Sequence, residues 1–253
     1  RIILVIFIMT RTLIIIPSRM AATRLPGKPL LKINNLSIIS HVFKRGEEAN
    51  VGEVVVATED QEIVDDVLKN GGRAVLTNNK HKTGTDRVFE AYKKLKIKGI
   101  DYILNLQGDE PDINKDDIIK LNTFMANSQS NIGTLAAKIE DGLILNNKNI
   151  VKVITKNKLE NNNFPEALNF FRNNLSKKNS NTYHHIGIYC YKVSALENFI
   201  NLKQTQNEID NKLEQLRALD NNLNINVALA KTSPVGVDTE EDYLAIKKLW
   251  NIN

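Results

Sequence analysis

The chain has 253 residues, 42% of them hydrophobic and 25% charged, a balance typical of a globular protein with a sizeable core. Its net charge of +5 suits an anionic substrate such as a nucleotide. Nucleic acid would suit that charge too, but aromatic residues make up only 6% and no basic–aromatic repeat occurs, so we expect no nucleic-acid partner. The single cysteine, Cys190, excludes an intrachain disulfide and a cysteine-built zinc site, and it is consistent with a cytoplasmic location.

The first eight residues are almost wholly apolar. Thr10 and Arg11 interrupt this run far short of the roughly 20 residues that a membrane-spanning helix needs, so we expect no membrane partner. No small-residue cleavage site of a signal peptide follows. We interpret residues 1–8 as an upstream or non-native extension, with Met9 as the biological start, and we expect one domain over residues 1–253.

Short apolar runs alternate with amphipathic stretches along the chain. The runs predict strands at 13–16, 53–58, 74–77, 102–106, 132–139, 151–155, 183–191 and 225–230. Helical spacing predicts helices at 36–48, 60–68, 85–95, 113–125, 208–219 and 240–250. The alternation in the first half predicts an α/β fold with a mostly parallel, doubly wound sheet. Ligands of such sheets bind beyond the carboxyl ends of the strands, so we expect the polar loops 17–28, 58–60 and 107–111 to share one rim.

The loop after the first predicted strand carries three cations, Arg19, Arg24 and Lys28, and Gly27 permits close approach of its backbone. A triphosphate needs such a set of positive charges. The loop contains neither a Walker A motif nor a GxGxxG fingerprint. The alternative is a solvated basic surface loop.

Two aspartates are candidate ligands of Mg²⁺, which usually takes one or two protein carboxylates together with phosphate oxygens and water. Asp109 follows a predicted buried strand, and Asp238 precedes the last predicted helix. Each has an alternative role as a helix cap. By contrast, the four histidines lack the spacing of a zinc site, and the adjacent His184 and His185 should point to opposite faces of a strand.

Six ordered motifs resemble the 3-deoxy-manno-octulosonate cytidylyltransferase (CMP-KDO synthetase) family. They are IPSRMAATRLPGKPL (16–30), HKTGTDR (81–87), NLQGDEP (105–111), HHIGIYCY (184–191), LEQLRAL (213–219) and GVDTEEDY (236–243). The resemblance implies a fold of the nucleotide-diphospho-sugar transferase type, with a smaller dimerisation lobe from the second half, and a homodimer. It implies transfer of CMP from CTP to 3-deoxy-D-manno-octulosonate, with release of pyrophosphate, for lipopolysaccharide biosynthesis.

The resemblance also implies roles for individual residues. Arg19, Lys28 and Asp109 would be catalytic, and Asp109 and Asp238 would hold Mg²⁺. The nucleotide would be bound by Arg19, Arg24, Lys28, Thr83, Gly84, Thr85 and Arg87. The sugar acid would be bound by Gln107, Arg172, His185, Tyr189, Glu214 and Gln215.

The sequence departs from the family pattern in three places. Ala22 stands where the family often has Ser, His184 stands where it usually has Arg, and the usual Ile-Pro is absent after Arg172. The last two departures concern the sugar side. A cytidylyltransferase for a related amino-substituted octulosonate or a nonulosonate is therefore the closest alternative, although RLPGKPL argues against the sialic-acid branch. A non-catalytic nucleotide-binding protein is a second alternative, and the joint presence of Arg19, Lys28 and both aspartates argues against it.

Overall fold

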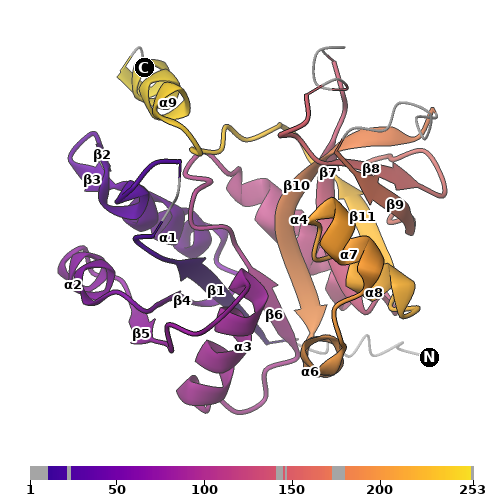
Figure 1. The fold of residues 1–253 in the computed structure, drawn as a ribbon, viewed down its shortest axis with the longest axis horizontal. Helices are drawn as coiled ribbons and strands as arrows, with labels where there is room; N and C mark the ends of the chain where they lie inside the picture. The colour runs from indigo at the N-terminus through magenta and orange to yellow at the C-terminus, as the bar shows by residue number, and fades with distance from the viewer. Residues whose placement is uncertain (1–10, 22–23, 141–144, 146, 173–179, 252–253) are drawn as a thin grey trace, which may run out of the picture.

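A computed structural model describes residues 11–21, 24–140, 145, 147–172 and 180–251, and these residues form a mixed α/β fold (Figure 1). The expectations about residues 1–8, Met9 and Ala22, and about the segment that follows Arg172, lie outside the described residues. No helix among the described ranges combines the length and the apolar character that crossing a bilayer requires.

One large sheet forms the centre of the described structure. Its strands are β1 (Thr12–Ser18), β4 (Gly52–Thr58), β5 (Ala74–Leu76), β6 (Tyr102–Asn105), β7 (Ile132–Ala137), β8 (Lys152–Thr155), β9 (Ala167–Phe171), β10 (Thr182–Lys192) and β11 (Ile225–Leu229). The main strand order is β11-β7-β10-β6-β1-β4-β5. A separate small hairpin pairs β2 (Lys32–Ile33) with β3 (Leu36–Ser37).

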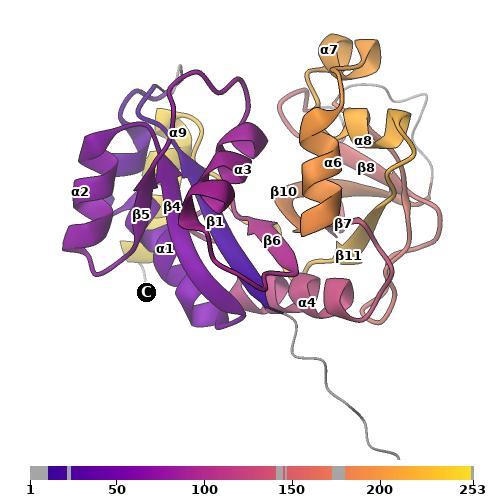
Figure 2. The ribbon, with the colours of Figure 1, turned by 90° about the horizontal axis from the view of Figure 1, so that it is seen from below.

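The first half of the sheet is parallel, as predicted. β1 pairs in parallel with both β4 and β6, and β4 pairs in parallel with β5. β10 then runs antiparallel between β6 and β7, and it also pairs with β8, which pairs with β9. β11 pairs in parallel with β7, so the strands of the second half build a mixed, mainly antiparallel extension at one side. This extension lies apart from the helices α1 and α2 of the first half in Figure 2. The prediction that this part is a dimerisation lobe stays a prediction.

The helices are α1 (Ile38–Ala49), α2 (Gln61–Lys69), α3 (Gly84–Leu95), α4 (Lys115–Ala126), α6 (Val193–Asn201), α7 (Gln206–Asn211), α8 (Leu216–Asp220) and α9 (Glu240–Asn251), with a 3₁₀ turn η1 at Lys28–Leu30. They cover both faces of the sheet because buried strand residues alternate between the faces. In β1, Leu13 and Ile15 face a core that includes α3, α6 and α8. Ile14 and Ile16 face a second core that includes α1, α2 and α4.

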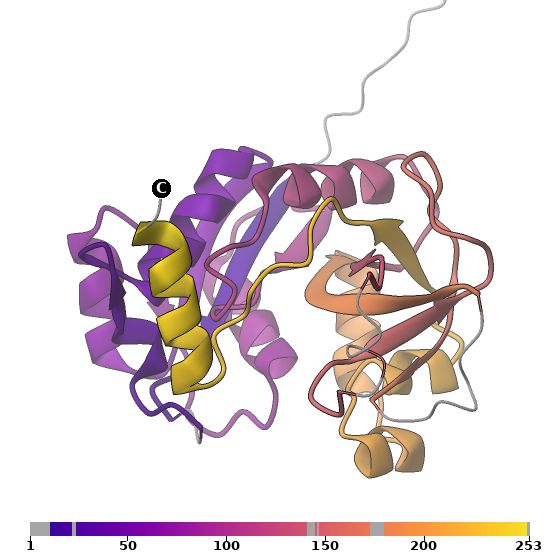
Figure 3. The same cartoon turned by 90° about the horizontal axis from the view of Figure 1, so that it is seen from above.

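The C-terminal helix α9 returns to the first half of the molecule. An extended segment runs from the end of β11 to the start of α9, and Figure 3 shows it crossing between the two halves. Val237 and Ile246 are buried in a small third core with Ile33 and Ile38. The chain therefore brings residues around position 238 back to the loop that follows β1.

The predicted helix over residues 208–219 is wrong. The chain forms two short helices, α7 and α8, because Lys212 adopts the left-handed conformation with φ of 52° and ends α7. A buried ion pair holds the two helices together: Arg217 donates to Glu208 from Nε at 2.8 Å and from Nη2 at 2.5 Å. Sequence patterns also missed β9, α6 and the β2–β3 hairpin, which are short elements with few periodic positions.

The Glu208–Arg217 pair should contribute strongly to stability, because both side chains are only 5% exposed. Glu208→Gln removes the nearer countercharge of the buried guanidinium and leaves, among the described residues, only the ion pair with Glu214 Oε1 at 3.7 Å, so we expect the free energy of unfolding to fall by about 3 kcal/mol. Asp210→Asn, on the exposed side of the same helix, is the matched control and should change it by less than about 0.5 kcal/mol. Urea denaturation measures both, and equal effects of the two variants would contradict the prediction.

Candidate active site

The carboxyl ends of β1, β4 and β6 share one rim, as predicted. At Gly108, just after β6, a Cβ atom would lie only 2.8 Å from the carbonyl oxygen of Pro17 in β1, so the two loops approach as closely as glycine allows. The backbone N–H of Met20 donates to Asp60 Oδ2 at 2.7 Å, which ties the basic loop to the residues after β4. The three polar loops therefore meet beyond the strand ends.

The basic loop turns inward at Gly27. This residue has φ of 70°, a conformation that favours glycine, and its N–H donates to the carbonyl of Met20 at 3.2 Å. The short η1 turn then begins at Lys28 and contains the buried Pro29. The turn points Lys28 into the molecule, where its side chain is only 12% exposed. Arg19, by contrast, is exposed and makes no hydrogen bond or ion pair to the described residues.

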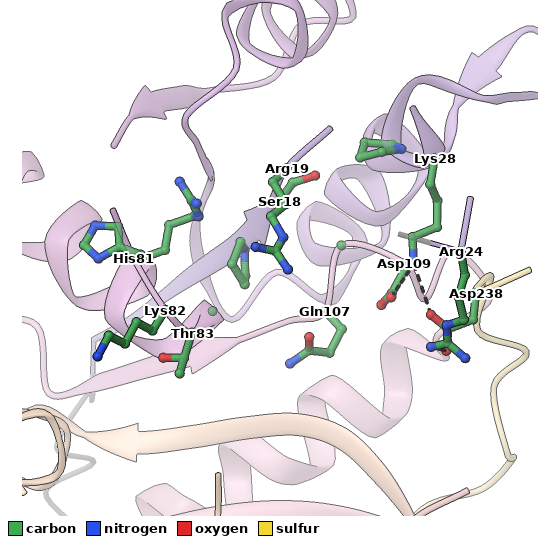
Figure 4. A pocket seen from close by; sticks show the side chains of 15 residues that line it. Ser18, Arg19, Arg24, Lys28, His81, Lys82, Thr83, Gln107, Asp109 and Asp238 are labelled. Atoms are coloured by element: carbon green, nitrogen blue, oxygen red, sulfur yellow. Dashed lines mark hydrogen bonds and ion pairs between the residues drawn. The ribbon is translucent and has the colours of Figure 1, made fainter. Parts of the chain in front are cut away.

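Asp109 and Asp238 come together in space, although they are far apart in the sequence. Lys28 Nζ donates to Asp109 Oδ2 at 2.7 Å and to Asp238 Oδ1 at 3.2 Å (Figure 4). Arg24 pairs with the other oxygen of Asp238 at 2.9 Å. The backbone N–H of Val237 also donates to the carbonyl of Asp109 at 2.8 Å, so the two acidic segments are joined directly.

A third carboxyl group, that of Glu110, lies near this pair. Glu110 follows Asp109, and its Oε2 is shielded from solvent without a hydrogen-bond partner. Burial, together with the nearby charges of Asp109 and Asp238, raises the pKa of Glu110 to about 8. Glu110 is therefore mainly protonated at pH 7. The charges of Asp109 and Asp238 are offset by ion pairs with Lys28 and Arg24.

Asp109 and Asp238 fit a magnesium ion. One carboxylate oxygen of each already lies within hydrogen-bond distance of a single cationic atom, Lys28 Nζ. Mg²⁺ prefers oxygen ligands and usually takes only one or two protein carboxylates, with water and phosphate oxygens completing its shell. The cavity beside the pair leaves room for such ligands.

A cavity of about 400 Å³ lies along the rim. Figure 4 shows the Lys28–Asp109–Asp238 group with Arg24 at one end and His81, Lys82 and Thr83 at the other, with Arg19 and Gln107 between them. The full lining is Pro17, Ser18, Arg19, Arg24, Lys28, Pro29, His81, Lys82, Thr83, Gly84, Arg87, Gln107, Gly108, Asp109 and Asp238. The structure thus brings together all the residues predicted on the nucleotide side except Thr85.

Arg87, Thr85 and Thr83, which were also predicted on the nucleotide side, have partners within the protein. Arg87 is 4% exposed, pairs with Glu59 and donates to Thr77 Oγ1 at 2.5 Å. Its guanidinium is therefore fixed in position at the cavity wall. Thr85 is buried and donates to Glu214 Oε2 at 2.8 Å, on the side away from the large cavity. Thr83 caps α3 by accepting from the N–H of Asp86. The helix N-terminus therefore faces the cavity with its partial positive charge.

Three of the residues predicted to bind the sugar acid line a second, smaller cavity. Tyr189, Glu214 and Gln215 enclose about 60 Å³ together with Tyr191 and apolar side chains. Burial raises the pKa of Glu214, whose Oε1 has no hydrogen-bond partner. Such a carboxyl group is available to a hydroxyl-bearing ligand.

The other residues predicted on the sugar side, Gln107, Arg172 and His185, do not line this small cavity. Gln107 lines the large cavity and donates to the carbonyl of Gly187, at a bulge of β10. Arg172 donates to the carbonyl of Asn149 at 2.8 Å. His185 is 7% exposed, and its Nε2 lies 3.0 Å from Thr134 Oγ1. His184 bonds Ser233 through Nδ1, so the two histidines have separate surroundings, as expected for neighbours in a strand.

Sequence reasoning missed several residues at the site. His81 and Lys82 line the cavity, and the signal was their position directly before the Thr83 cap of α3. Lys152 is fully buried and donates from Nζ to the carbonyls of Asn147, Ile150 and Arg172. It therefore supports the backbone at Arg172, and a lone lysine in an apolar run gives no sequence signal for that role.

The fold and the site together define a class of protein. A cationic loop after the first strand of a parallel sheet, facing two converging carboxylates, is the arrangement of a nucleotidyltransferase of the nucleotide-diphospho-sugar transferase type. UDP-glucose pyrophosphorylase complexed with UDP-glucose has the same fold, with a TM-score of 0.73 over 96% of this chain and 99% of that chain at 15% identity.

Closer relatives specify the family. The family model described as cytidylyltransferase matches residues 13–225. The 3-deoxy-manno-octulosonate cytidylyltransferases of Rhodopseudomonas palustris strain BisB18 and Thermodesulfovibrio yellowstonii are 44% and 42% identical, over 92% and 95% of this chain and 95% and 98% of theirs. A solved CMP:2-keto-3-deoxy-manno-octonic acid synthetase complexed with CTP matches with a TM-score of 0.85 and 33% identity, over 96% of this chain and 99% of that chain. The chain belongs to the 3-deoxy-manno-octulosonate cytidylyltransferase family.

His185 should make stability depend on pH. Burial, together with the charges of His184 and Arg172, lowers its pKa from 6.5 to about 3. The unfolded chain binds a proton below pH 6.5 and the folded chain does not, so stability falls as the pH drops from about 6.5 towards 3. His185→Gln should remove about 2 kcal/mol of the loss in unfolding free energy between pH 7 and pH 5. Urea denaturation at both pH values measures it, and an unchanged loss in the variant, which retains His41 and His184, would contradict the prediction.

Proposed function

We propose that the chain transfers CMP from CTP to 3-deoxy-D-manno-octulosonate and releases pyrophosphate, for lipopolysaccharide biosynthesis. The observation that carries the proposal is the meeting of Asp109, Asp238 and Lys28 at one end of a rim cavity lined by further cations. The names of the relatives support the choice of CTP and of this sugar acid.

The cationic side chains would bind and orient the triphosphate. Arg19, exposed in the cavity and without a described protein partner, is available for phosphate oxygens. Lys82 and the N-terminus of α3 supply positive charge at the opposite end. Arg87 is already held by Glu59, so it contributes to the local field rather than to direct binding. These groups stabilise the negative charge that develops on the departing pyrophosphate.

In the proposed reaction, the anomeric hydroxyl oxygen of the sugar acid attacks the α-phosphorus of CTP in line. The new O–P bond forms as the bond from the α-phosphorus to the bridging oxygen of the β-phosphate breaks, and the hydroxyl proton passes to solvent. Mg²⁺ held by Asp109 and Asp238 would supply Lewis-acid stabilisation of the α-phosphate charge. Lys28, now paired with both aspartates, would be available to the phosphates when another cation satisfies these carboxylates.

The sugar acid would lie between the two cavities. Gln107 reaches the large cavity, whereas Tyr189, Glu214 and Gln215 line the small one. Hydroxyl groups of the sugar would bond Glu214 Oε1, which has no hydrogen-bond partner but lies 3.7 Å from Arg217 Nη2. Arg172 would pair with the carboxylate of the sugar acid. A homodimer and a cytoplasmic location complete the proposal, and light scattering and cell fractionation test them.

Pyrophosphate release tests the proposed function. Purified protein is given CTP and Mg²⁺, with 3-deoxy-D-manno-octulosonate supplied or withheld, and parallel reactions contain an amino-substituted octulosonate or a nonulosonate. We expect release that requires the metal and 3-deoxy-D-manno-octulosonate. Release that is faster with another of these acids would replace the assigned sugar, and nucleotide binding without release under every condition would refute the transferase assignment.

Removing either metal ligand should abolish most turnover. In Asp109→Asn or Asp238→Asn, one anionic ligand becomes a neutral amide, and we expect kcat/KM to fall by about 100-fold or more with the fold intact. Asp116→Asn is the matched control, since Asp116 forms an exposed ion pair with Lys231. Circular dichroism verifies folding, and near-normal turnover in either site variant would exclude that aspartate from the metal site.

A further inference from the structure

Asp238 lies in a segment that has no strand or helix of its own. β11 ends at Leu229 and α9 begins at Glu240, and the chain between them is extended and irregular (Figure 3). A ligand in such a segment needs other contacts to hold it in place. One is the bond from the N–H of Val237 to the carbonyl of Asp109.

The second contact comes from Asp242, in the first turn of α9. Its Oδ2 accepts from the backbone N–H of Asp238 at 3.0 Å and from that of Thr239 at 2.9 Å. Thr239 Oγ1 in turn accepts from the N–H of Asp242 at 3.2 Å. This reciprocal pattern is a capping box with an aspartate in the place of the usual glutamate. Because the acceptor is ionised, these bonds are stronger than neutral ones.

The helix that carries Asp242 is itself fixed to both sides of the site. Tyr243 Oη donates to the carbonyl of Lys32, which follows the basic loop, at 2.7 Å. Trp250 Nε1 donates at 3.3 Å to Oδ1 of Asp112, a residue just after the loop that carries Asp109. Ile246 is fully buried against the core of Ile33 and Ile38. Asp242 thus connects the Asp238 backbone to an anchored element.

We infer that Asp242 is a positioning residue for the metal site: it holds the Asp238 carboxylate opposite Asp109 through the Asp238 amide. The inference rests on the proposed role of Asp238 as a metal ligand. A plain helix cap would stabilise α9 without affecting metal affinity. A positioning residue changes metal affinity in a folded protein.

Binding of Mn²⁺ alone tests the inference without turnover. The electron paramagnetic resonance signal of unbound Mn²⁺ is followed in titrations of the wild-type protein and of Asp242→Ala, below the melting temperature of each. We expect the dissociation constant to rise about 10-fold or more in Asp242→Ala. Asp242→Ser, whose side chain is too short to reach both amides, should weaken binding similarly and serves if the alanine variant does not fold.

Two further variants show whether Mn²⁺ affinity depends on the hydrogen bonds that Asp242 accepts or on its negative charge. Asp242→Asn retains an acceptor oxygen of the same reach, so we expect Mn²⁺ affinity within about 3-fold of wild type. Glu241→Ala removes an equal charge from the same turn but from an exposed side chain, and it should leave affinity unchanged. Wild-type affinity in Asp242→Ala would overturn the inference, and so would losses in Asp242→Asn or Glu241→Ala as large as that in Asp242→Ala.

Kinetics add an independent readout. The Mg²⁺ concentration for half-maximal pyrophosphate release should rise in Asp242→Ala, whereas the KM for CTP at saturating Mg²⁺ should change little. If the wild-type protein releases no pyrophosphate but its Mn²⁺ affinity depends on Asp238 and Asp242, the proposed reaction fails and the inference stands. If release is normal but Mn²⁺ affinity is insensitive to Asp242, the inference fails and the reaction stands.

Discussion

The balance of charge around Asp109 and Asp238 is the constraint on which the rest of the site depends. Asp109 and Asp238 share one ammonium group, and two carboxylates this close repel each other unless a cation offsets their charge. In this structure Lys28 supplies that cation. If a divalent ion replaced Lys28 between these carboxylates, as we propose, the lysine would be free for phosphate. Charge balance would then join metal binding to nucleotide binding.

The fold meets this demand through close backbone approaches at the rim of the sheet. Gly108 permits the loop after β6 to touch the end of β1, and Gly27 turns Lys28 towards it. The long return of the chain to α9 then supplies the second carboxylate from the far end of the sequence. Rigid strands position two parts of the site, and an anchored helix positions the third. The acidic pair of this chain therefore lies where the sheet and the C-terminal helix meet.

Sequence reasoning found the elements with long, regular periodicity and the loops that follow them. β1, β4 and β6 were predicted because their apolar runs are buried on both faces, and the shared rim follows from parallel topology. The sequence alone could not show which side chains pair with one another within the site. The ion pair that occupies Arg87, the turn of Thr85 towards Glu214 and the left-handed break at Lys212 each depend on side chains brought together by folding. The placement of Tyr189, Glu214 and Gln215 at a separate small cavity, while Gln107 lines the large one, likewise depends on how the second half folds.

The position of Mn²⁺ in crystals grown with CTP would test this account most directly, because anomalous scattering locates the ion without assumptions about ligands. We expect a peak bound by the carboxylates of both Asp109 and Asp238, with Lys28 Nζ moved from between them to the triphosphate. A peak held by phosphate oxygens alone, with Lys28 still joining the two carboxylates, would contradict it.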